Sequence, residues 1–331
     1  MKATDERSSV VVVGAGMAGL AAANELRLGG VRVLVLDKGR GVGGRMATRR
    51  IDGATFDHGA QFITSRDSRF RALVEQGRQA GAVEEWFRDG AGNADGDIHW
   101  RGKPAISAVA KQLALGLELH LETTVTAVHR EAFCWRVETD SGSLFTVEAV
   151  VLTAPVPQSL RLLDAGDLVI DSKIRARLEA IQYDRCLAVM AILEAPSRIP
   201  VPGFITPSQG PIASISDNQV KAISAEPAVT IHATPEFSLE HWDADRQVVG
   251  RTLLEAASPW TGSGIKTFQV HGWRYSKSIR TDEELCAVAN QSPPLILAGD
   301  GFGGPSVEGA AISGWAAAEV ILMNRRRSSH T

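Results

Sequence analysis

A short apolar run followed by three spaced glycines constrains the fold of this chain more than any other stretch. Residues 10–20 read VVVVGAGMAGL, and Gly14, Gly16 and Gly19 have the spacing G-x-G-x-x-G. This spacing predicts a β-strand, a tight turn and the start of a helix. Gly16 would leave room for a pyrophosphate and Gly19 would let the helix lie close to the sheet. The N–H groups of the first helical turn would then face the phosphates.

The residues that follow agree with a nucleotide-binding βαβ unit. Residues 20–28 read as a helix, Gly29 and Gly30 end it, and residues 31–36 (VRVLVL) predict a second buried parallel strand. Asp37 closes that strand about twenty residues past the glycines, where a carboxylate accepts hydrogen bonds from a ribose. An ordinary βαβ unit without a nucleotide is the alternative, but strand, glycines, helix and acid all favour the nucleotide.

The composition narrows the class of protein. With 331 residues, 44% of them apolar and 22% charged, the chain predicts about two globular domains. The formal net charge of -3 gives no positive field for nucleic acid. Cys134, Cys186 and Cys286 are too far apart in sequence for a metal site, a disulfide framework or dithiol chemistry. The apolar run at 10–13 is too short for a signal peptide or membrane span, so we expect a cytoplasmic protein without a membrane partner.

A second glycine-rich loop indicates which cofactor the first one binds. Residues 38–46 read KGRGVGGRM and end in Gly-Gly-Arg at Arg45. A loop that approaches a diphosphate closely, with a guanidinium to pair it, suits a cofactor larger than NAD. At this point the sequence resembles the glutathione-reductase-type FAD superfamily, in the branch of amine oxidases, protoporphyrinogen oxidases, phytoene desaturases and renalases.

Several later segments are similar to those of renalases in particular. These are residues 59–64 (GAQFIT), 100–104 (WRGKP), 232–234 (HAT) and 271–276 (HGWRYS), although Ala105 stands where the family has glycine. Without the resemblance, Gly59 would still permit close approach of a flat ring, and Gln61 and Phe62 offer a hydrogen-bonding and a stacking group. Phe62 would otherwise be assigned to the core, and a lone strand histidine such as His232 is more often structural.

Two strand ends discriminate among the flavoprotein classes. Residues 153–155 read TAP, as in amine oxidase and renalase relatives, whereas aromatic hydroxylases have Gly-Ala-Asp-Gly there, so a monooxygenase is disfavoured. A second G-x-G-x-x-G is missing, which disfavours a resident NAD domain. Residues 294–302 (PLILAGDGF) predict a buried strand that ends in Gly299 and Asp300 before a helix. By the resemblance Asp300 contacts the ribityl or pyrophosphate region; a helix cap is the alternative.

The resemblance implies an α/β fold with a Rossmann-type FAD-binding domain and a substrate domain of mixed sheet plus helices. This is the two-domain architecture of p-hydroxybenzoate hydroxylase and the amine oxidases. We expect the FAD-binding domain at 1–65, 101–160 and 290–325, the substrate domain at 66–100 and 161–289, and a disordered tail at 326–331. The FAD is expected to be non-covalent. The residues implied to contact it are Gly14, Ala15, Gly16, Met17, Ala18, Gly19, Asp37, Lys38, Gly44, Arg45, Met46, His58, Gly59, Ala60, Gln61, Phe62, Val125, Ala154, Gly299, Asp300, Val307, Glu308 and Ala310.

The activity implied is that of an FAD-dependent oxidase for the 2- and 6-dihydro isomers of NAD(P)H, which yields NAD(P)+ while O2 becomes H2O2. The partners are then a dihydropyridine dinucleotide and O2, in a monomer or homodimer. A flavin amine oxidase or other FAD-dependent dehydrogenase, or a non-catalytic FAD-binding module, are the alternatives. An aromatic amine cage would have two tyrosines available, Tyr183 and Tyr275. The residues expected to line the substrate slot are Gln61, Phe62, His232, Thr234, Trp273 and Tyr275. Arg274 could bind a substrate phosphate or pair with a structural carboxylate, and the structural role is favoured.

Overall fold

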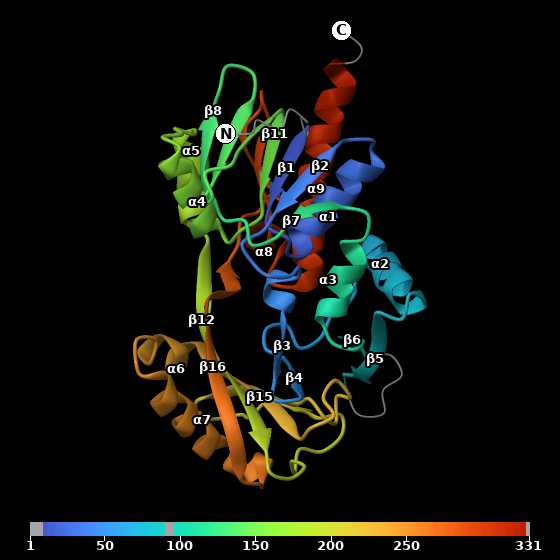
Figure 1. Cartoon of the computed structure of the whole chain (residues 1–331), viewed down its shortest axis with the longest axis vertical. Coiled ribbons are helices and arrows are strands. Elements are labelled where there is room, and N and C mark those ends of the chain that lie inside the picture. Colours follow the sequence, from blue (N-terminus) through green and yellow to red (C-terminus); the bar gives the residue numbers. More distant parts are fainter. Residues whose placement is uncertain (1–8, 90–95, 329–331) are drawn as a thin grey trace. The chain divides into compact units, whose positions relative to one another are not determined.

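The computed structural model describes residues 9–89 and 96–328, which form two compact units (Figure 1). Unit 1 contains the residues up to 44, residues 110–182 and those from 278 onward; unit 2 contains residues 45–109 and 183–277. Four elements include residues of both: η1 (Gly44–Met46), α3 (Ser107–Leu113), β12 (Gln182–Leu193) and β16 (Ile265–Arg280). The domain boundaries expected from the sequence differ from these divisions and stay a prediction.

Unit 1 is built on a six-stranded sheet in the order β17-β18-β11-β1-β2-β7. Its strands are parallel apart from β17, which runs antiparallel to β18. All four residues of β1 are buried, as expected of a central parallel strand covered on both faces. The strands are β1 (Val10–Val13), β2 (Val33–Leu36), β7 (Glu118–His120), β11 (Ala149–Leu152), β17 (Ala287–Asn290) and β18 (Leu295–Leu297).

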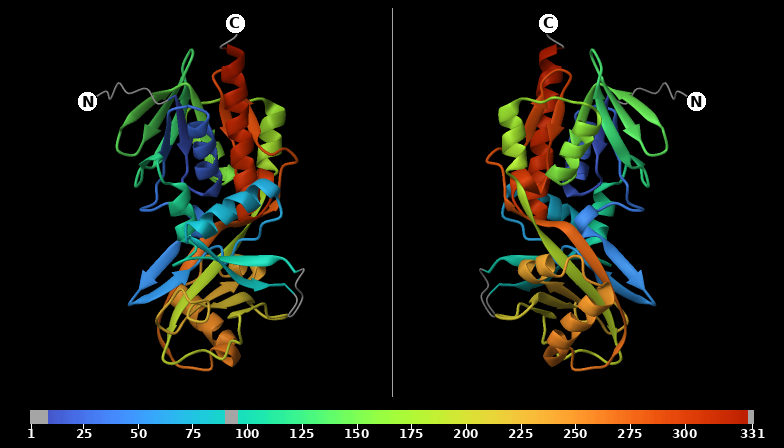
Figure 2. Two further views of the ribbon diagram at one scale, coloured as in Figure 1. Left: turned by 90° about the vertical axis from the view of Figure 1, so that its right-hand side faces the viewer. Right: turned by 90° about the vertical axis from the view of Figure 1, so that its left-hand side faces the viewer.

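Helices α1 and α9 lie side by side in unit 1, as Figure 2 shows. A Cβ atom on Gly314 of α9 would lie 2.1 Å from the carbonyl oxygen of Ala18 in α1, so only glycine permits this approach. An antiparallel sheet of β10-β9-β8 packs against α4. The remaining elements are α1 (Met17–Leu28), β8 (Val125–Arg130), β9 (Trp135–Thr139), β10 (Leu144–Val147), α4 (Val156–Ala165), α5 (Ser172–Glu179), α8 (Asp300–Gly303) and α9 (Val307–Ser328).

Unit 2 is built on a five-stranded sheet in the order β13-β14-β15-β12-β16. Successive side chains of β12 point to opposite faces. Leu187 and Val189 pack with the core beneath α7, whereas Met190 packs with Phe56 of β4 on the other face. The elements are β3 (Thr48–Ile51), β4 (Ala54–Asp57), α2 (Ser68–Gln79), β5 (Val83–Arg88), β6 (Ile98–Gly102), β13 (Phe204–Ile205), β14 (Ile212–Asp217), β15 (Ala228–Ala233), α6 (Pro235–Glu240) and α7 (Arg246–Thr261).

The expected fold class is confirmed, because unit 1 has the parallel Rossmann-like sheet and unit 2 has mixed sheet plus helices. One prediction is wrong in part: residues 326–328 of the expected disordered tail belong to α9, which continues the helical pattern to Ser328. Residues 329–331 lie outside the described residues. Within the described ranges, no helix has both the length and the apolar content needed to cross a membrane. The same ranges contain no cluster of three or more His, Cys, Asp or Glu suited to a metal ion.

Candidate functional site

The carboxyl ends of four neighbouring parallel strands gather the expected nucleotide-binding residues of unit 1. Gly14 follows β1, Asp37 follows β2, Ala154 lies two residues past β11, and Gly299 lies two residues past β18. Because the strands are parallel, these residues share one edge of the sheet. That edge is where open α/β sheets bind nucleotides.

The first glycine turn has one position that the fold itself leaves open. Gly14 has φ +112°, and Thr153 Oγ donates hydrogen bonds to the carbonyl oxygens of Val13 (2.9 Å) and Gly14 (3.3 Å). A Cβ atom on Gly19 would lie 1.8 Å from the oxygen of Gly14. A Cβ atom on Gly16 would meet nothing within 4 Å. Gly14 and Gly19 are therefore required by packing, whereas Gly16 leaves a cradle that suits a phosphate at the start of α1.

Asp37 ties the two glycine-rich loops together. Its Oδ2 accepts the N–H of Ala15 at 2.6 Å and its Oδ1 accepts the N–H of Gly39 at 2.6 Å. The N–H of Gly43 donates to the carbonyl of Ala15 at 2.8 Å, and Gly16 forms a bridge with Gly43. The loop that contains Lys38 and Gly44 therefore lies against the first turn, as a diphosphate site made of both loops requires.

The last segment of unit 1 brings Asp300 to the same edge. Asp300 is the first residue of α8 and is 5% exposed, and its carbonyl accepts a hydrogen bond from Ser278 Oγ at 2.8 Å. Gly299 is the N-cap of α8, so Asp300 is not the cap that the alternative interpretation supposed. Val307, Glu308 and Ala310 lie in the first turn of α9. Val125, the remaining residue expected to contact FAD, begins β8.

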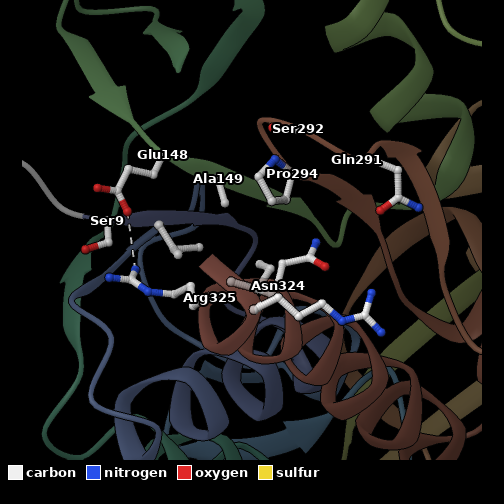
Figure 3. Close-up of a pocket in the computed structure, with 11 residues that line it drawn as sticks. Ser9, Glu148, Ala149, Gln291, Ser292, Pro294, Asn324 and Arg325 are labelled. Atoms are coloured by element: carbon white, nitrogen blue, oxygen red, sulfur yellow. Dashed lines mark hydrogen bonds and ion pairs between the residues drawn. The ribbon is translucent and has the colours of Figure 1, made fainter. Parts of the chain in front are cut away.

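A pocket of unit 1 lies at the opposite edge of the sheet (Figure 3). It measures about 550 Å³ and lies at the amino ends of β1, β11 and β18, where Val10, Ala149 and Pro294 line it. An ion pair between Arg325 Nη1 and Glu148 Oε2 (3.3 Å) borders it. Because nucleotides bind at the carboxyl edge of such sheets, this pocket is not the nucleotide site.

In unit 2, a buried ion pair holds the loop that begins after β4. Lys221 Nζ lies 2.9 Å from Asp57 Oδ2 and donates at 2.6 Å to the carbonyl oxygen of Gln61, and both charged side chains are 0% exposed. Asp57 Oδ1 also accepts from Thr48 Oγ (2.8 Å) and from the N–H of Ile106 (3.1 Å). Burial lowers the pKa of Lys221, while Asp57 acts in the opposite direction. The loop 57–61 is therefore fixed from two sides.

Two polar atoms of this loop are buried without a hydrogen-bond partner among the described residues. Gln61 Nε2 donates to the carbonyl oxygens of Asp57 (2.7 Å) and Gly59 (3.1 Å), which leaves Gln61 Oε1 as an unused acceptor. His58 Nδ1 has no partner either. A buried polar atom without a partner costs stability unless a bound molecule supplies one. The loop therefore has two buried polar atoms available to a bound molecule. A Cβ atom on Gly59 would lie 1.9 Å from the carbonyl oxygen of Arg45, so packing within the protein requires this glycine.

His58 is the centre of a cluster drawn from three elements. Its carbonyl oxygen accepts hydrogen bonds from His232 Nε2 on β15 (3.1 Å) and Trp273 Nε1 on β16 (2.8 Å). Its ring stacks on Trp273 at 5.2 Å and meets the ring of His271 edge-on at 5.0 Å. A carbonyl only accepts, so His232 has its proton on Nε2 and its Nδ1 is an acceptor.

The three histidines of this cluster are neutral at neutral pH. The pKa of His58 is lowered to about 3, mainly by burial and also by His271, Arg49 and His232. Burial also lowers the pKa of His232 and of His271. The cluster therefore presents flat, uncharged rings rather than a positive charge.

The structure gives three of the expected slot residues other contacts. Phe62 lies in an aromatic cluster, with its ring 4.3 Å from that of His99. The side chain of Thr234 accepts the N–H of Phe237 at 3.3 Å and caps α6. The ring of Tyr275 lies 5.6 Å from that of Tyr183. His232 and Trp273 donate hydrogen bonds to the carbonyl oxygen of His58, and Gln61 donates to the carbonyl oxygens of Asp57 and Gly59. Roles in the substrate slot for all six expected residues stay predictions.

Arg45 and Arg274 also have defined surroundings in unit 2. Arg45 Nη1 donates to the carbonyl oxygens of Tyr275 (3.3 Å) and Ser276 (3.2 Å), which ties Arg45 to β16. The guanidinium of Arg274 lies 5.8 Å from the ring of Trp242.

The sequence alone did not indicate Lys221 or its ion pair with Asp57, because neither position belongs to a recognisable pattern. His271 lies within a motif that was recognised and could have been included.

Comparisons with known proteins agree with this arrangement. The model of an NAD(P)-binding Rossmann-like domain matches residues 12–76, and that of the flavin containing amine oxidoreductases matches residues 84–194. The chain is 30% identical to the renalase of Mus musculus over 340 residues, which cover 95% of this chain and 98% of that protein.

Solved structures show the same fold at low sequence identity. A protein of Exiguobacterium sp. 255-15, named as a candidate protoporphyrinogen oxidase, has a TM-score of 0.74 at 14% identity, over 97% of this chain and 100% of that one. A putrescine oxidase bound to putrescine has a TM-score of 0.68 at 15% identity, over 96% of this chain and 99% of that one. Both likenesses concern the fold alone.

Proposed function

The chain belongs to the renalase family, and from this we propose that it is an FAD-dependent oxidase of the 2- and 6-dihydro isomers of NAD(P)H. The substrate loses a hydride from ring carbon 2 or 6 and becomes NAD(P)+. The two electrons, with the transferred hydrogen and one proton from solvent, reduce O2 to H2O2.

FAD is the cofactor indicated by the flavin containing amine oxidoreductase model and by the renalase relative. The residues present fit it. The open cradle at Gly16 and the carboxylate of Asp37 suit the diphosphate and ribose, and the unpartnered Oε1 of Gln61 suits a polar ring. When bound, FAD supplies a two-electron acceptor, and the chain supplies orientation and electrostatics.

The observation that carries this proposal is a cluster of flat, neutral rings without a general base. Hydride loss from a dihydropyridine restores an aromatic ring and releases no proton, so the site needs no group to accept one. His58, His232 and His271 are held neutral, and Trp273 adds a flat wall. His232 Nδ1 is an acceptor that suits the N–H of a carboxamide. Orientation then provides most of the rate.

A flavin amine oxidase is the second candidate. The two tyrosines of the chain, Tyr183 and Tyr275, lie close together in unit 2 with ring centroids 5.6 Å apart, and aromatic ring faces attract an ammonium group. This candidate needs a base or a neutral amine for the proton that an amine loses, and the histidine cluster does not supply a group with a pKa near 7.

The test is anaerobic mixing of the purified yellow protein with borohydride-reduced NAD, which contains the isomers. We expect the visible flavin absorbance to bleach rapidly with this mixture and not with authentic 4-dihydro NADH, and peroxide to form when air is admitted. Bleaching by putrescine or another amine alone would favour the second candidate. A flavin that no reductant of either class bleaches would leave a non-catalytic FAD-binding module.

A further inference from the structure

Three arginines of unit 2 surround one tryptophan. The guanidinium carbons of Arg185, Arg246 and Arg274 lie 4.9, 5.3 and 5.8 Å from the ring centroid of Trp242, which is buried. They come from β12, α7 and β16 respectively. We refer to these three side chains as the arginine cluster. Three positive charges within 6 Å of one ring repel one another, so such a group needs compensation.

Carboxylates do not supply that compensation within the described residues. No described residue makes a hydrogen bond or ion pair with the side chain of any cluster arginine, and Arg246 Nη1 is buried without a partner. Other arginines of the chain are paired, as Arg101 is with Glu84 at 2.8 Å. Asp245, next to the cluster in sequence, accepts two backbone N–H groups of α7 instead. Guanidinium groups stay charged, so an anion would compensate the positive charge of the cluster.

The position of the cluster connects it with the histidine site. β16 is the edge strand of its sheet, and His271 and Trp273 on it alternate with Gly272 and Arg274. A Cβ atom on Gly272 would lie 3.3 Å from Arg246 Nη2, so the cluster borders the strand between the two site residues. Burial lowers the pKa of His271 most, followed by Arg49 on β3 and then Arg246. The side chain of Arg49 has no partner among the described residues either.

We propose that the arginine cluster binds a phosphate or diphosphate group, and that this group belongs to the dinucleotide substrate. The second part rests on the proposed function. Planar guanidinium forks match phosphate oxygens in pairs, and an indole beneath them keeps their planes in place. A dinucleotide whose nicotinamide lies on the His58 and Trp273 face would cross the edge strand near Gly272, where the side chains of Trp242 and Arg246 lie 3.1 and 3.3 Å from the position of a Cβ atom.

The test measures binding of inorganic pyrophosphate by titration calorimetry to the FAD-loaded protein and to variants. Arg246→Gln and Arg274→Gln each remove one guanidinium of the cluster. Because Arg274 is exposed, the fold should tolerate its substitution. Arg251→Gln is the matched control, because Arg251 is an exposed residue of the same helix outside the cluster. We expect saturable binding to the parent, a Kd raised about tenfold or more in each cluster variant, and no change in the control.

The source of the phosphate is decided with two substrates. Anaerobic flavin bleaching is measured with the dihydro isomers of NADH and with those of nicotinamide riboside, which has no phosphate. Cluster variants should need about tenfold more dinucleotide for half-maximal bleaching rate, with the maximal rate unchanged, while the riboside shows no difference.

Each of the other possible outcomes would contradict one part of the proposal. A parent protein without saturable pyrophosphate binding, or an equal loss in Arg251→Gln, would overturn the site. Pyrophosphate binding with unchanged dinucleotide dependence would assign the cluster to free phosphate instead of the substrate. If neither substrate bleaches the parent flavin, the proposed function fails, and the calorimetry still tests the cluster.

Discussion

Removing the ammonium group of Lys221 should destabilise unit 2 more than removal of any surface charge. Lys221→Met leaves the carboxylate of Asp57 buried without its counter-charge at 2.9 Å and the carbonyl of Gln61 without its donor at 2.6 Å. At an effective dielectric constant of about 20, a pair at this distance attracts by about 6 kcal/mol. Part of that offsets desolvation, so we expect unfolding free energy to fall by about 3–5 kcal/mol.

The assay is urea unfolding of the parent, Lys221→Met, Asp57→Asn and the double variant, with Lys266→Met as a control. Lys266 is exposed on β16, so its change should stay within about 0.5 kcal/mol. The loss of unfolding free energy in the double variant should be smaller than the sum of the two single losses by at least about 1.5 kcal/mol. The reason is that the double variant leaves no unpaired buried charge. Lys221→Met should also retain less FAD, since loop 57–61 loses one of its supports.

The reasoning would be refuted by a loss under about 1 kcal/mol in Lys221→Met, or by single losses that simply add. Either result would mean that water or a shifted backbone compensates Asp57, and that the pair does not hold the loop.

Three further predictions concern the histidine cluster and the glycine turn. The folded protein keeps His58 neutral down to a pKa of about 3 whereas the unfolded chain protonates near pH 6.5, so stability should fall as pH falls through this window, by up to about 1.4 kcal/mol per pH unit. Urea unfolding at several pH values should show a smaller slope of unfolding free energy against pH in His58→Gln than in the parent. The control variant His120→Gln should keep the parent slope, and equal slopes in the two variants would contradict the burial of a neutral His58 ring. Gly16→Ala should keep the melting temperature of the FAD-free protein but weaken FAD binding about tenfold or more, whereas Gly19→Ala should not fold because its Cβ meets Gly14 at 1.8 Å; unchanged FAD affinity in Gly16→Ala would disprove the cradle. Trp273→Phe keeps the ring on His58 but removes the N–H, so chemical unfolding should show a loss of about 1 kcal/mol, and a loss of zero would show that this hydrogen bond does not hold the cluster.

Local patterns predicted which segments of unit 1 end at one edge of the parallel sheet. The glycine turn, Asp37, the TAP segment and Gly299 each follow a buried apolar run, and parallel pairing brings such strand ends to one edge. The disordered tail expected at 326–331 is wrong for its first three residues, because α9 continues to Ser328. Strand, turn and helix signals are short-range, so a sequence carries them directly.

Long-range polar contacts in unit 2 could not be predicted in this way. Lys221 is separated from Asp57 by 164 residues and stands in a polar stretch that composition would place on the surface. Its burial depends on where two hairpins meet. Phe62 has two conflicting expectations. The residue type alone suggests a core position, whereas the family resemblance suggests the substrate slot. In the structure its ring lies among other aromatic rings.

The measurement that tests the central claim most directly is the isotope effect on flavin bleaching. Dihydro isomers of NAD with two deuterium atoms on the reduced carbon are mixed anaerobically with the protein, and their rate is compared with that of the protiated isomers. Hydride transfer from carbon 2 or 6 predicts slower bleaching with deuterium and one NAD+ formed per flavin. Equal rates together with no NAD+ formed, or bleaching by 4-dihydro NADH alone, would contradict the account.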